Sequence, residues 1–180
     1  MRVLLASALL LPACIGGQDT GPATLSTNGG APRTISAWAS QPDDYLLGIN
    51  GAGNAYMAWN IKLGDLPAGT DCASGTGHGS LQHDASSWLV SIDIAVPDKN
   101  WKLGAGPVTV GTLSSVAPPT TAPLADVQVF DDSPGADMLP QGTLTITSID
   151  DTAITGTLDA TGSGATTAAS ATFTANRCDF

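Results

Sequence analysis

Two histidines and an aspartate stand close together in one short segment and could do metal or acid–base chemistry. His78 and His83 are the only histidines of the chain, and Asp84 follows the second directly. Zinc accepts imidazole and carboxylate ligands, but these histidines are five residues apart in a glycine-rich stretch. We therefore expect no metal and no cofactor here. A metal-dependent enzyme built on this loop is kept as an alternative.

The same segment offers the residue types of a serine hydrolase. Ser74 or Ser80 could be combined with His78 and Asp84, but the chain has no G-x-S-x-G motif. Catalytic triads are recognised by geometry, and closeness in sequence is weak evidence for one. We expect a protein that is not an enzyme, with a secreted hydrolase as the alternative.

An acidic segment, residues 131–137, places side-chain oxygens at Asp131, Ser133 and Asp137. Calcium prefers such ligands, but the EF-hand pattern fails because the chain contains no glutamate. The segment is expected to be a solvated acidic turn, and the residues leave calcium binding open.

Four tryptophans are the remaining candidates for ligand contact. Trp59 and Trp88 lie in alternating apolar segments and are expected in the core. Trp38 and Trp101 are the candidates for stacking on a sugar ring, Trp101 because polar neighbours surround it in "PDKNWKLG". A carbohydrate-binding surface module is therefore a second alternative function.

The N-terminus has the layout of an export signal. Positively charged Met1-Arg2 precedes eleven uncharged residues, too few for a membrane-spanning helix, which needs about 20. That run ends in Leu11-Pro12-Ala13-Cys14, which resembles the lipobox of bacterial lipoproteins, although Pro12 departs from the small residues usual there. The resemblance implies that residues 1–13 are removed and that Cys14 is acylated. It implies a cell-envelope location, in the periplasmic or surface leaflet of the outer membrane.

Residues 14–32 are expected to form the acylated cysteine and a flexible tether. Their Gly, Thr, Ser, Pro and Asn content buries little apolar surface. A coil of this length reaches about 20–25 Å, so the folded domain, residues 33–180, would stand just off the lipid headgroups.

Charge narrows the choice of partners. Six Lys and Arg residues face sixteen acidic ones, all aspartate, for a net charge of −10. Such a chain has no basic stripe for nucleic acid, and anionic lipid would repel it. Membrane contact is therefore expected through the acyl chains, with an envelope glycan or protein as the further partner.

The other two cysteines, Cys72 and Cys178, are expected to form a disulfide. An even pair in an exported protein favours a bridge, which would join an internal loop to the C-terminus. No Cys-x-x-Cys motif marks a redox site.

Short alternating segments between Gly, Pro and Asp turns predict an all-β domain. The clearest is 88–96, with Trp88, Val90, Ile92, Ile94 and Val96 on one face. We expect an antiparallel β-sandwich, or a partly open barrel, of about 8–9 strands. The other expected strands are 34–39 at an edge, 45–50, 55–63, 107–113, 126–130, 142–149, 153–160 and 169–175.

The last forty residues carry a second resemblance. A Gly-led strand, an acidic turn and a final Phe-x-Ala-x-x-Cys strand are similar to the closing segment of small bacterial lipoproteins of uncharacterised function, including those of myxobacteria. A strand with an internal glycine follows the acidic turn in that segment too, and the positions are Gly142, Asp150, Gly156, Phe173, Ala175 and Cys178. The resemblance implies a surface β-domain and brings no catalytic residues with it. The inward positions of the hairpin at Asp150–Thr152 are expected to be Leu144, Ile146, Ile154 and Leu158.

Overall fold

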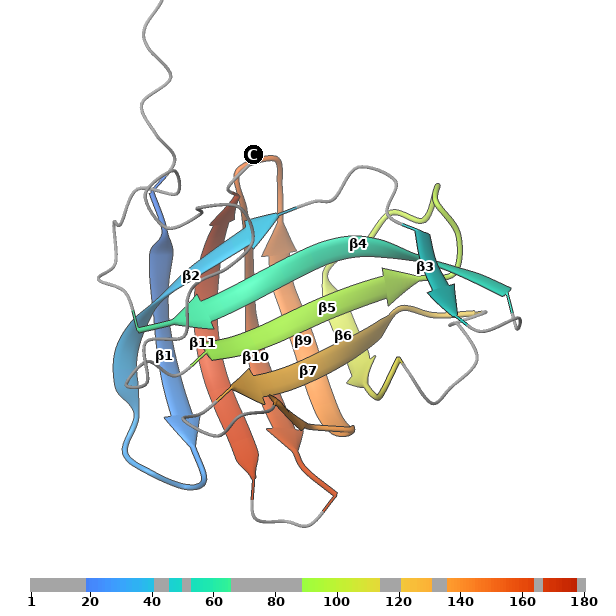
Figure 1. The fold of residues 1–180 in the computed structure, drawn as a ribbon. Helices are drawn as coiled ribbons and strands as arrows, with labels where there is room; N and C mark the ends of the chain where they lie inside the picture. Colours follow the sequence, from blue (N-terminus) through green and yellow to red (C-terminus); the bar gives the residue numbers. More distant parts are fainter. Residues whose placement is uncertain are drawn as a thin grey trace, which may run out of the picture.

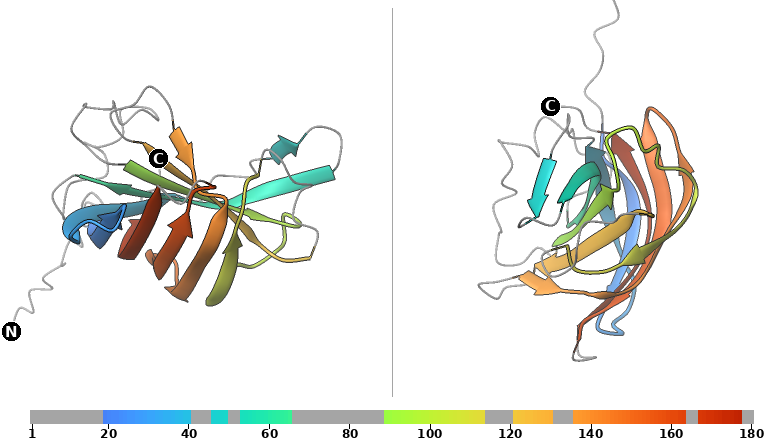
Figure 2. Two further views of the ribbon diagram at one scale, coloured as in Figure 1. Left: turned by 90° about the horizontal axis from the view of Figure 1, so that it is seen from below. Right: turned by 90° about the vertical axis from the view of Figure 1, so that its right-hand side faces the viewer.

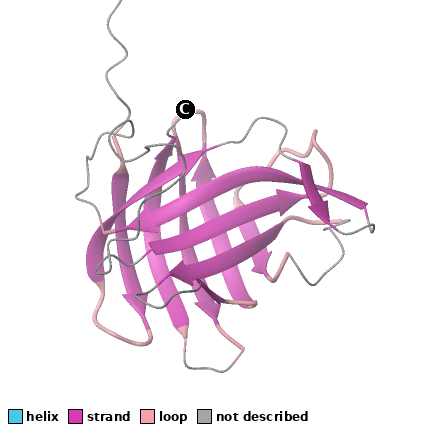
Figure 3. Ribbon diagram, in the orientation of Figure 1, coloured by secondary structure: helices cyan, strands magenta, loops and turns pink. Residues whose placement is uncertain are grey.

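The described part of the chain consists of strands and the turns between them, and it contains no helix (Figures 1 and 3). This computed structural model describes residues 19–40, 46–49, 53–65, 89–113, 121–130, 136–163 and 167–177. The strands are β1 (Gly21–Thr27), β2 (Arg33–Ser40), β3 (Leu46–Ile49), β4 (Gly53–Gly64), β5 (Leu89–Val96), β6 (Gly106–Val110), β7 (Leu124–Phe130), β8 (Ala136–Met138), β9 (Gln141–Ile149), β10 (Ala153–Thr161) and β11 (Ala168–Arg177). The all-β prediction is confirmed.

Nine of the strands close into a barrel, in the order β1-β2-β4-β5-β7-β6-β9-β10-β11 and back to β1. The pairings β6–β7 and β11–β2 are parallel and the others antiparallel. Short β3 pairs with β4, and β8 with β7, outside this ring. The expected antiparallel sandwich is thus corrected to a closed barrel of mixed strand orientation. Alternation of apolar residues is the same in both architectures, so the pattern could not separate them.

β2 is what closes the ring. Its first half pairs with β1 and its second half with β4. It therefore passes from one wall of the barrel, formed by β1, β11, β10 and β9, to a second wall, formed by β4, β5 and β7. The second wall crosses in front of the first wall in Figure 1, and Figure 2 shows both from two further sides. The expectation of an edge strand over residues 34–39 was wrong, since β2 has partners on both sides.

The tether expected over residues 14–32 is also too long. Residues 21–27 form β1, paired with both β2 and β11, and their alternate side chains are buried. Asn28 and Gly29, with φ of 52° and 71°, make the turn into β2. Asn-Gly with both residues at positive φ is a strong hairpin signal, and it could have identified this strand from the sequence.

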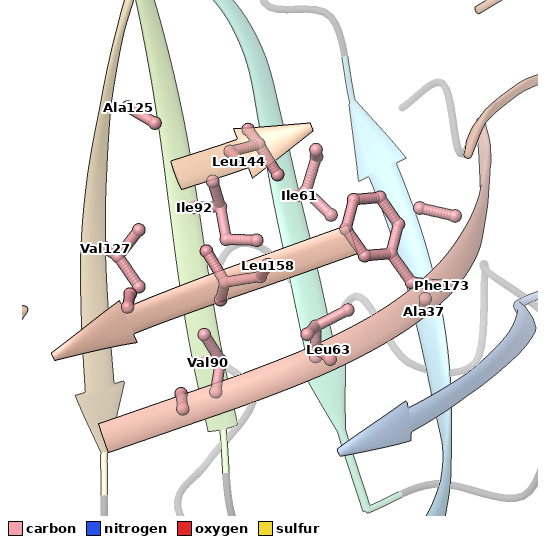
Figure 4. Packing of buried hydrophobic residues seen from close by; sticks show 14 of the residues in the cluster. Ala37, Ile61, Leu63, Val90, Ile92, Ala125, Val127, Leu144, Leu158 and Phe173 are labelled. Atoms are coloured by element: carbon pink, nitrogen blue, oxygen red, sulfur yellow. The ribbon is translucent and has the colours of Figure 1, made fainter. Parts of the chain in front are cut away.

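Apolar side chains from the two walls meet inside the barrel (Figure 4). Phe173 of β11 lies among Leu63, Ile61 and Ala37 of the facing strands, and all four are at most 1% exposed. Every residue of 88–96 that was expected inward and is described, Val90, Ile92, Ile94 and Val96, is buried. The barrel interior is therefore a packed core.

The β9–β10 hairpin follows the sequence prediction closely. Leu144, Ile146, Ile154 and Leu158 are all buried. The Asp150 carboxylate accepts hydrogen bonds from the backbone N–H of Thr152 at 2.7 Å and of Ala153 at 3.0 Å, which holds the turn. These bonds favour the charged carboxylate, so with the Thr152 hydroxyl bond they lower the pKa of Asp150.

Several predicted positions lie outside the described residues. These are the signal peptide, Cys14, Cys72, Ser74, His78, Ser80, His83, Asp84, Trp88, Asp131, Ser133 and Cys178. The structure lends the Cys72–Cys178 disulfide no support, and it stays a prediction. No helix in the described ranges is long and apolar enough to span a membrane.

Candidate functional site

Two rows of side chains cross the outer face of β2, β4, β5 and β7. Residues directly opposite each other in the sheet share a face. The register aligns Ser40, Asn60, Asp93 and Asp126 in one row. The second row is Trp38, Lys62, Ser91 and Gln128. We call these two sets the outer rows.

The outer rows exist because polar and apolar residues alternate along these strands. Ile61, Ile92 and Val127 point into the core, so their neighbours in sequence point outward. Outward residues are usually solvated, but here Ser91 is only 3% exposed and Asp126 only 5%. Buried polar groups need partners, which makes the contacts within the rows informative.

Lys62 and Ser91 form the closest described contact of the second row. Lys62 Nζ donates a hydrogen bond to Ser91 Oγ at 2.6 Å. Burial lowers the pKa of Lys62, and the negative charge of Asp93 opposes this in part. A lysine whose proton is held less tightly, beside a hydroxyl, is a recognised arrangement of a base and a nucleophile.

Asp93 is held in place from β4. Asn60 Nδ2 donates a short hydrogen bond to Asp93 Oδ1. Asp93 lies opposite Asp126, so two carboxyl groups face each other across β5 and β7. Like charges at such positions destabilise a sheet.

Asp126 shows the effect of that environment. Its pKa is raised, mainly by burial and also by Asp93, while hydrogen bonds from the Leu113 N–H and the Gln128 amide act in the opposite direction. The Leu113 N–H donates to Oδ2 at 3.0 Å. Oδ1 is buried and receives no hydrogen bond of suitable geometry from the described residues. This oxygen is therefore a buried acceptor for which the described residues supply no well-formed hydrogen bond.

The two candidate tryptophans fall in different environments. Trp38 is 6% exposed, opposite Lys62 in the second outer row, so the expectation of an exposed stacking surface was wrong. Trp101 is 38% exposed, as its polar neighbours predicted. Trp59 is buried in the core, with the Arg177 guanidinium 6.0 Å from its ring centre.

The sequence identified Ser91 and Asp93 only as the polar face of a strand. Their partners on β4 and β7 depend on register, which the sequence pattern does not fix across long connections. Within the described ranges, no three His, Cys, Asp or Glu side chains are grouped to hold a metal ion. No family model matches the chain, and no curated protein or solved structure matches it significantly.

Proposed function

We propose that the chain is a lipid-anchored cell-envelope protein whose β-barrel serves as a non-catalytic binding or structural module. The observation that carries the proposal is the layout of the N-terminus. An uncharged run ends in Leu11-Pro12-Ala13-Cys14, and β1 begins at Gly21, seven residues after the cysteine. Acylation of Cys14 would attach the barrel almost directly to the bilayer, in the outer membrane.

The anchor is tested by mass and by fractionation. Protein extracted from membranes should begin at Cys14 and carry the mass of acyl chains. Cys14→Ser should move the chain to the soluble fraction, and Cys72→Ser is the matched control that should leave it with the membrane. A Cys14→Ser chain that stays with the membrane contradicts the proposal.

We propose the outer rows as the place for a polar ligand, which must displace the covering residues to reach Asp126, 5% exposed. Asp126 Oδ1 lacks a donor among the described residues, and carboxylates at Asp93 and Asp126 accept hydrogen bonds from hydroxyl groups. An envelope glycan, with many hydroxyls, fits this chemistry. Calorimetric titration with soluble peptidoglycan fragments should give binding heat that Asp126→Asn abolishes and Asp151→Asn does not. No heat with the unaltered chain contradicts a glycan ligand of this class.

A hydrolase is the second candidate, and the Lys62–Ser91 contact favours it more than the His78/His83 loop does. A neutral Lys62 could take the proton of Ser91 as Oγ attacks an electrophile. With a fluorophosphonate probe, Oγ would bond to phosphorus, fluoride would leave, and the proton would pass to Lys62 Nζ. Intact mass should then show one adduct, absent from Ser91→Ala and present in Ser36→Ala, another buried serine. An unlabelled chain excludes this chemistry.

A further inference from the structure

The turn between β5 and β6, residues 97–105, carries an exposed tryptophan between two lysines. Trp101 is 38% exposed and is the one large apolar side chain classed as exposed among the described residues. Lys99 and Lys102 are exposed on either side of it. We call these three residues the Trp101 loop. Exposed tryptophan next to lysine is the composition found where proteins meet the membrane–water interface.

The loop has a defined shape. The Asp98 carboxylate accepts a hydrogen bond from the Asn100 N–H at 2.8 Å, and the Asp98 carbonyl accepts one from the Trp101 N–H at 3.0 Å. These bonds close a turn immediately before Trp101. The indole is therefore presented by an ordered backbone, which lowers the entropy lost when the side chain meets a surface.

Charge separates this loop from the rest of the molecule. The chain has only six Lys and Arg residues against sixteen Asp, yet two of the six lie within four residues here. With Asp98 included, the turn has a formal charge of +1. A phosphate-bearing surface would attract this turn while the acidic remainder of the protein is repelled.

The turn that carries Trp101 leads into β6, whose first residue lies at the end of the barrel where β1 begins. Figures 1 and 2 draw this turn on the far side of the barrel from β1, beyond β9, β10 and β11. Contacts between the strands show the shared end. Asn176 donates to the Asp19 carbonyl, the Arg177 N–H donates to the Thr152 carbonyl, and Gly106 at the start of β6 pairs with Ile146 near that turn. The start of β6 and the start of β1 therefore lie at the same end of the barrel.

We propose that the Trp101 loop contacts the phospholipid headgroups of the bilayer that holds the acyl chains of Cys14. This inference rests on the proposed lipid anchor. Six residues separate Cys14 from Gly21, a span of about 15 Å as a coil and at most about 25 Å when extended. So short a connection keeps this end of the barrel at the membrane surface. The indole lies at the headgroup level, and the two ammonium groups lie beside lipid phosphates.

Acidic residues at the same end set the tilt of the barrel. Asp150 and Asp151 are exposed at the β9–β10 turn, close to the start of β1. Anionic lipid repels these two carboxylates and attracts Lys99 and Lys102. The barrel is therefore tilted so that the Trp101 loop lies closer to the membrane than Asp150 and Asp151. The loop is then a second membrane contact besides the acylated Cys14.

Bromolipid quenching tests the contact. Lipidated full-length protein is reconstituted into phosphatidylcholine vesicles with brominated acyl chains, and tryptophan emission is compared with that in unbrominated vesicles. We expect quenching that is lost in Trp101→Phe and retained in Trp59→Phe, which removes a buried indole. Circular dichroism confirms that both variants are folded. Equal quenching in the unaltered chain and in Trp101→Phe overturns the proposal.

Vesicles with and without anionic lipid test the role of the charges on Lys99 and Lys102. With phosphatidylglycerol added, quenching should increase for the unaltered chain and should not increase for the double variant Lys99→Gln, Lys102→Gln. Identical responses overturn the role of the lysines. Flotation separates the two proposals: a chain that does not float with vesicles contradicts the anchor, whereas a floating chain without quenching contradicts the Trp101 contact alone. A Trp101 emission that responds only to added glycan also overturns the lipid contact.

Discussion

Lys62 Nζ lies 2.6 Å from Ser91 Oγ across the pairing of β4 with β5, and both side chains belong to the outer rows. An ammonium group that is largely removed from water depends on such an acceptor. The same contact therefore affects both the stability of the β4–β5 pairing and the reactivity proposed for Ser91.

Removing the Ser91 hydroxyl should therefore destabilise the fold. We expect Ser91→Ala to lower the free energy of unfolding by about 1–3 kcal/mol, because the buried ammonium loses its acceptor. In a Lys62→Met background the same change should cost much less, since no charge is left to satisfy. Urea unfolding of the four chains of this double-mutant cycle measures the difference. Equal costs in both backgrounds would show that the contact contributes nothing.

Asp126 should make stability depend on pH. The pKa of its carboxyl is raised above the ordinary value of 3.8, so the folded state holds the proton more tightly than the unfolded chain does. Its contribution to stability is full below the unfolded pKa and is lost as pH rises through the raised folded value. Asp126→Asn should flatten this fall in thermal unfolding midpoints above pH 4, and exposed Asp151→Asn should not. An unchanged profile in Asp126→Asn is the contrary result.

Gly156 should tolerate no side chain. A Cβ there would lie 2.5 Å from the Thr145 carbonyl oxygen and 3.1 Å from the Phe173 ring. Gly156→Ala is expected to cost about 1–3 kcal/mol, as overpacked cores do. The matched control is Gly104→Ala, where nothing lies within 4 Å of the new Cβ. Chemical denaturation of both variants checks this, and equal stability would contradict the packing described for β10.

The disulfide prediction is decided by thiol counting on the mature chain. Alkylation under denaturing conditions should add no label to Cys72 or Cys178 before reduction and two labels after it. Cys14 should stay unlabelled in both cases if its sulfur is acylated. Labelling of both cysteines without reductant would show that no bridge is present.

The sequence predicted strands well and their assembly poorly. β5 and the β9–β10 hairpin were recognised because inward and outward residues alternate strictly, as at Ile92, Asp93 and Ile94. β1 was missed because the Gly, Thr, Ser and Pro content of the segment suggested a tether, although Asn28-Gly29 marked the turn after it.

The outer rows could not be predicted at all. They require that Lys62 lie opposite Ser91, and Asp93 opposite Asp126, on strands separated by long connections. Register across such connections is set by packing of the whole barrel. The 6% exposure of Trp38 could not be predicted either, because the sequence pattern does not show what covers the outer face.

The pairing of β1 with β11 has a consequence for how the molecule is made. Ala23 lies opposite Phe173, so the first strand of the barrel finds this partner only after almost the whole chain has been synthesised. Contacts this distant in sequence slow folding, because a large loop must close before they form. Until then the edges of β1 and β10 that β11 later covers are unpaired, and such edges are prone to aggregation. The nascent protein is therefore most vulnerable late in its synthesis, until β11 has been made and has paired.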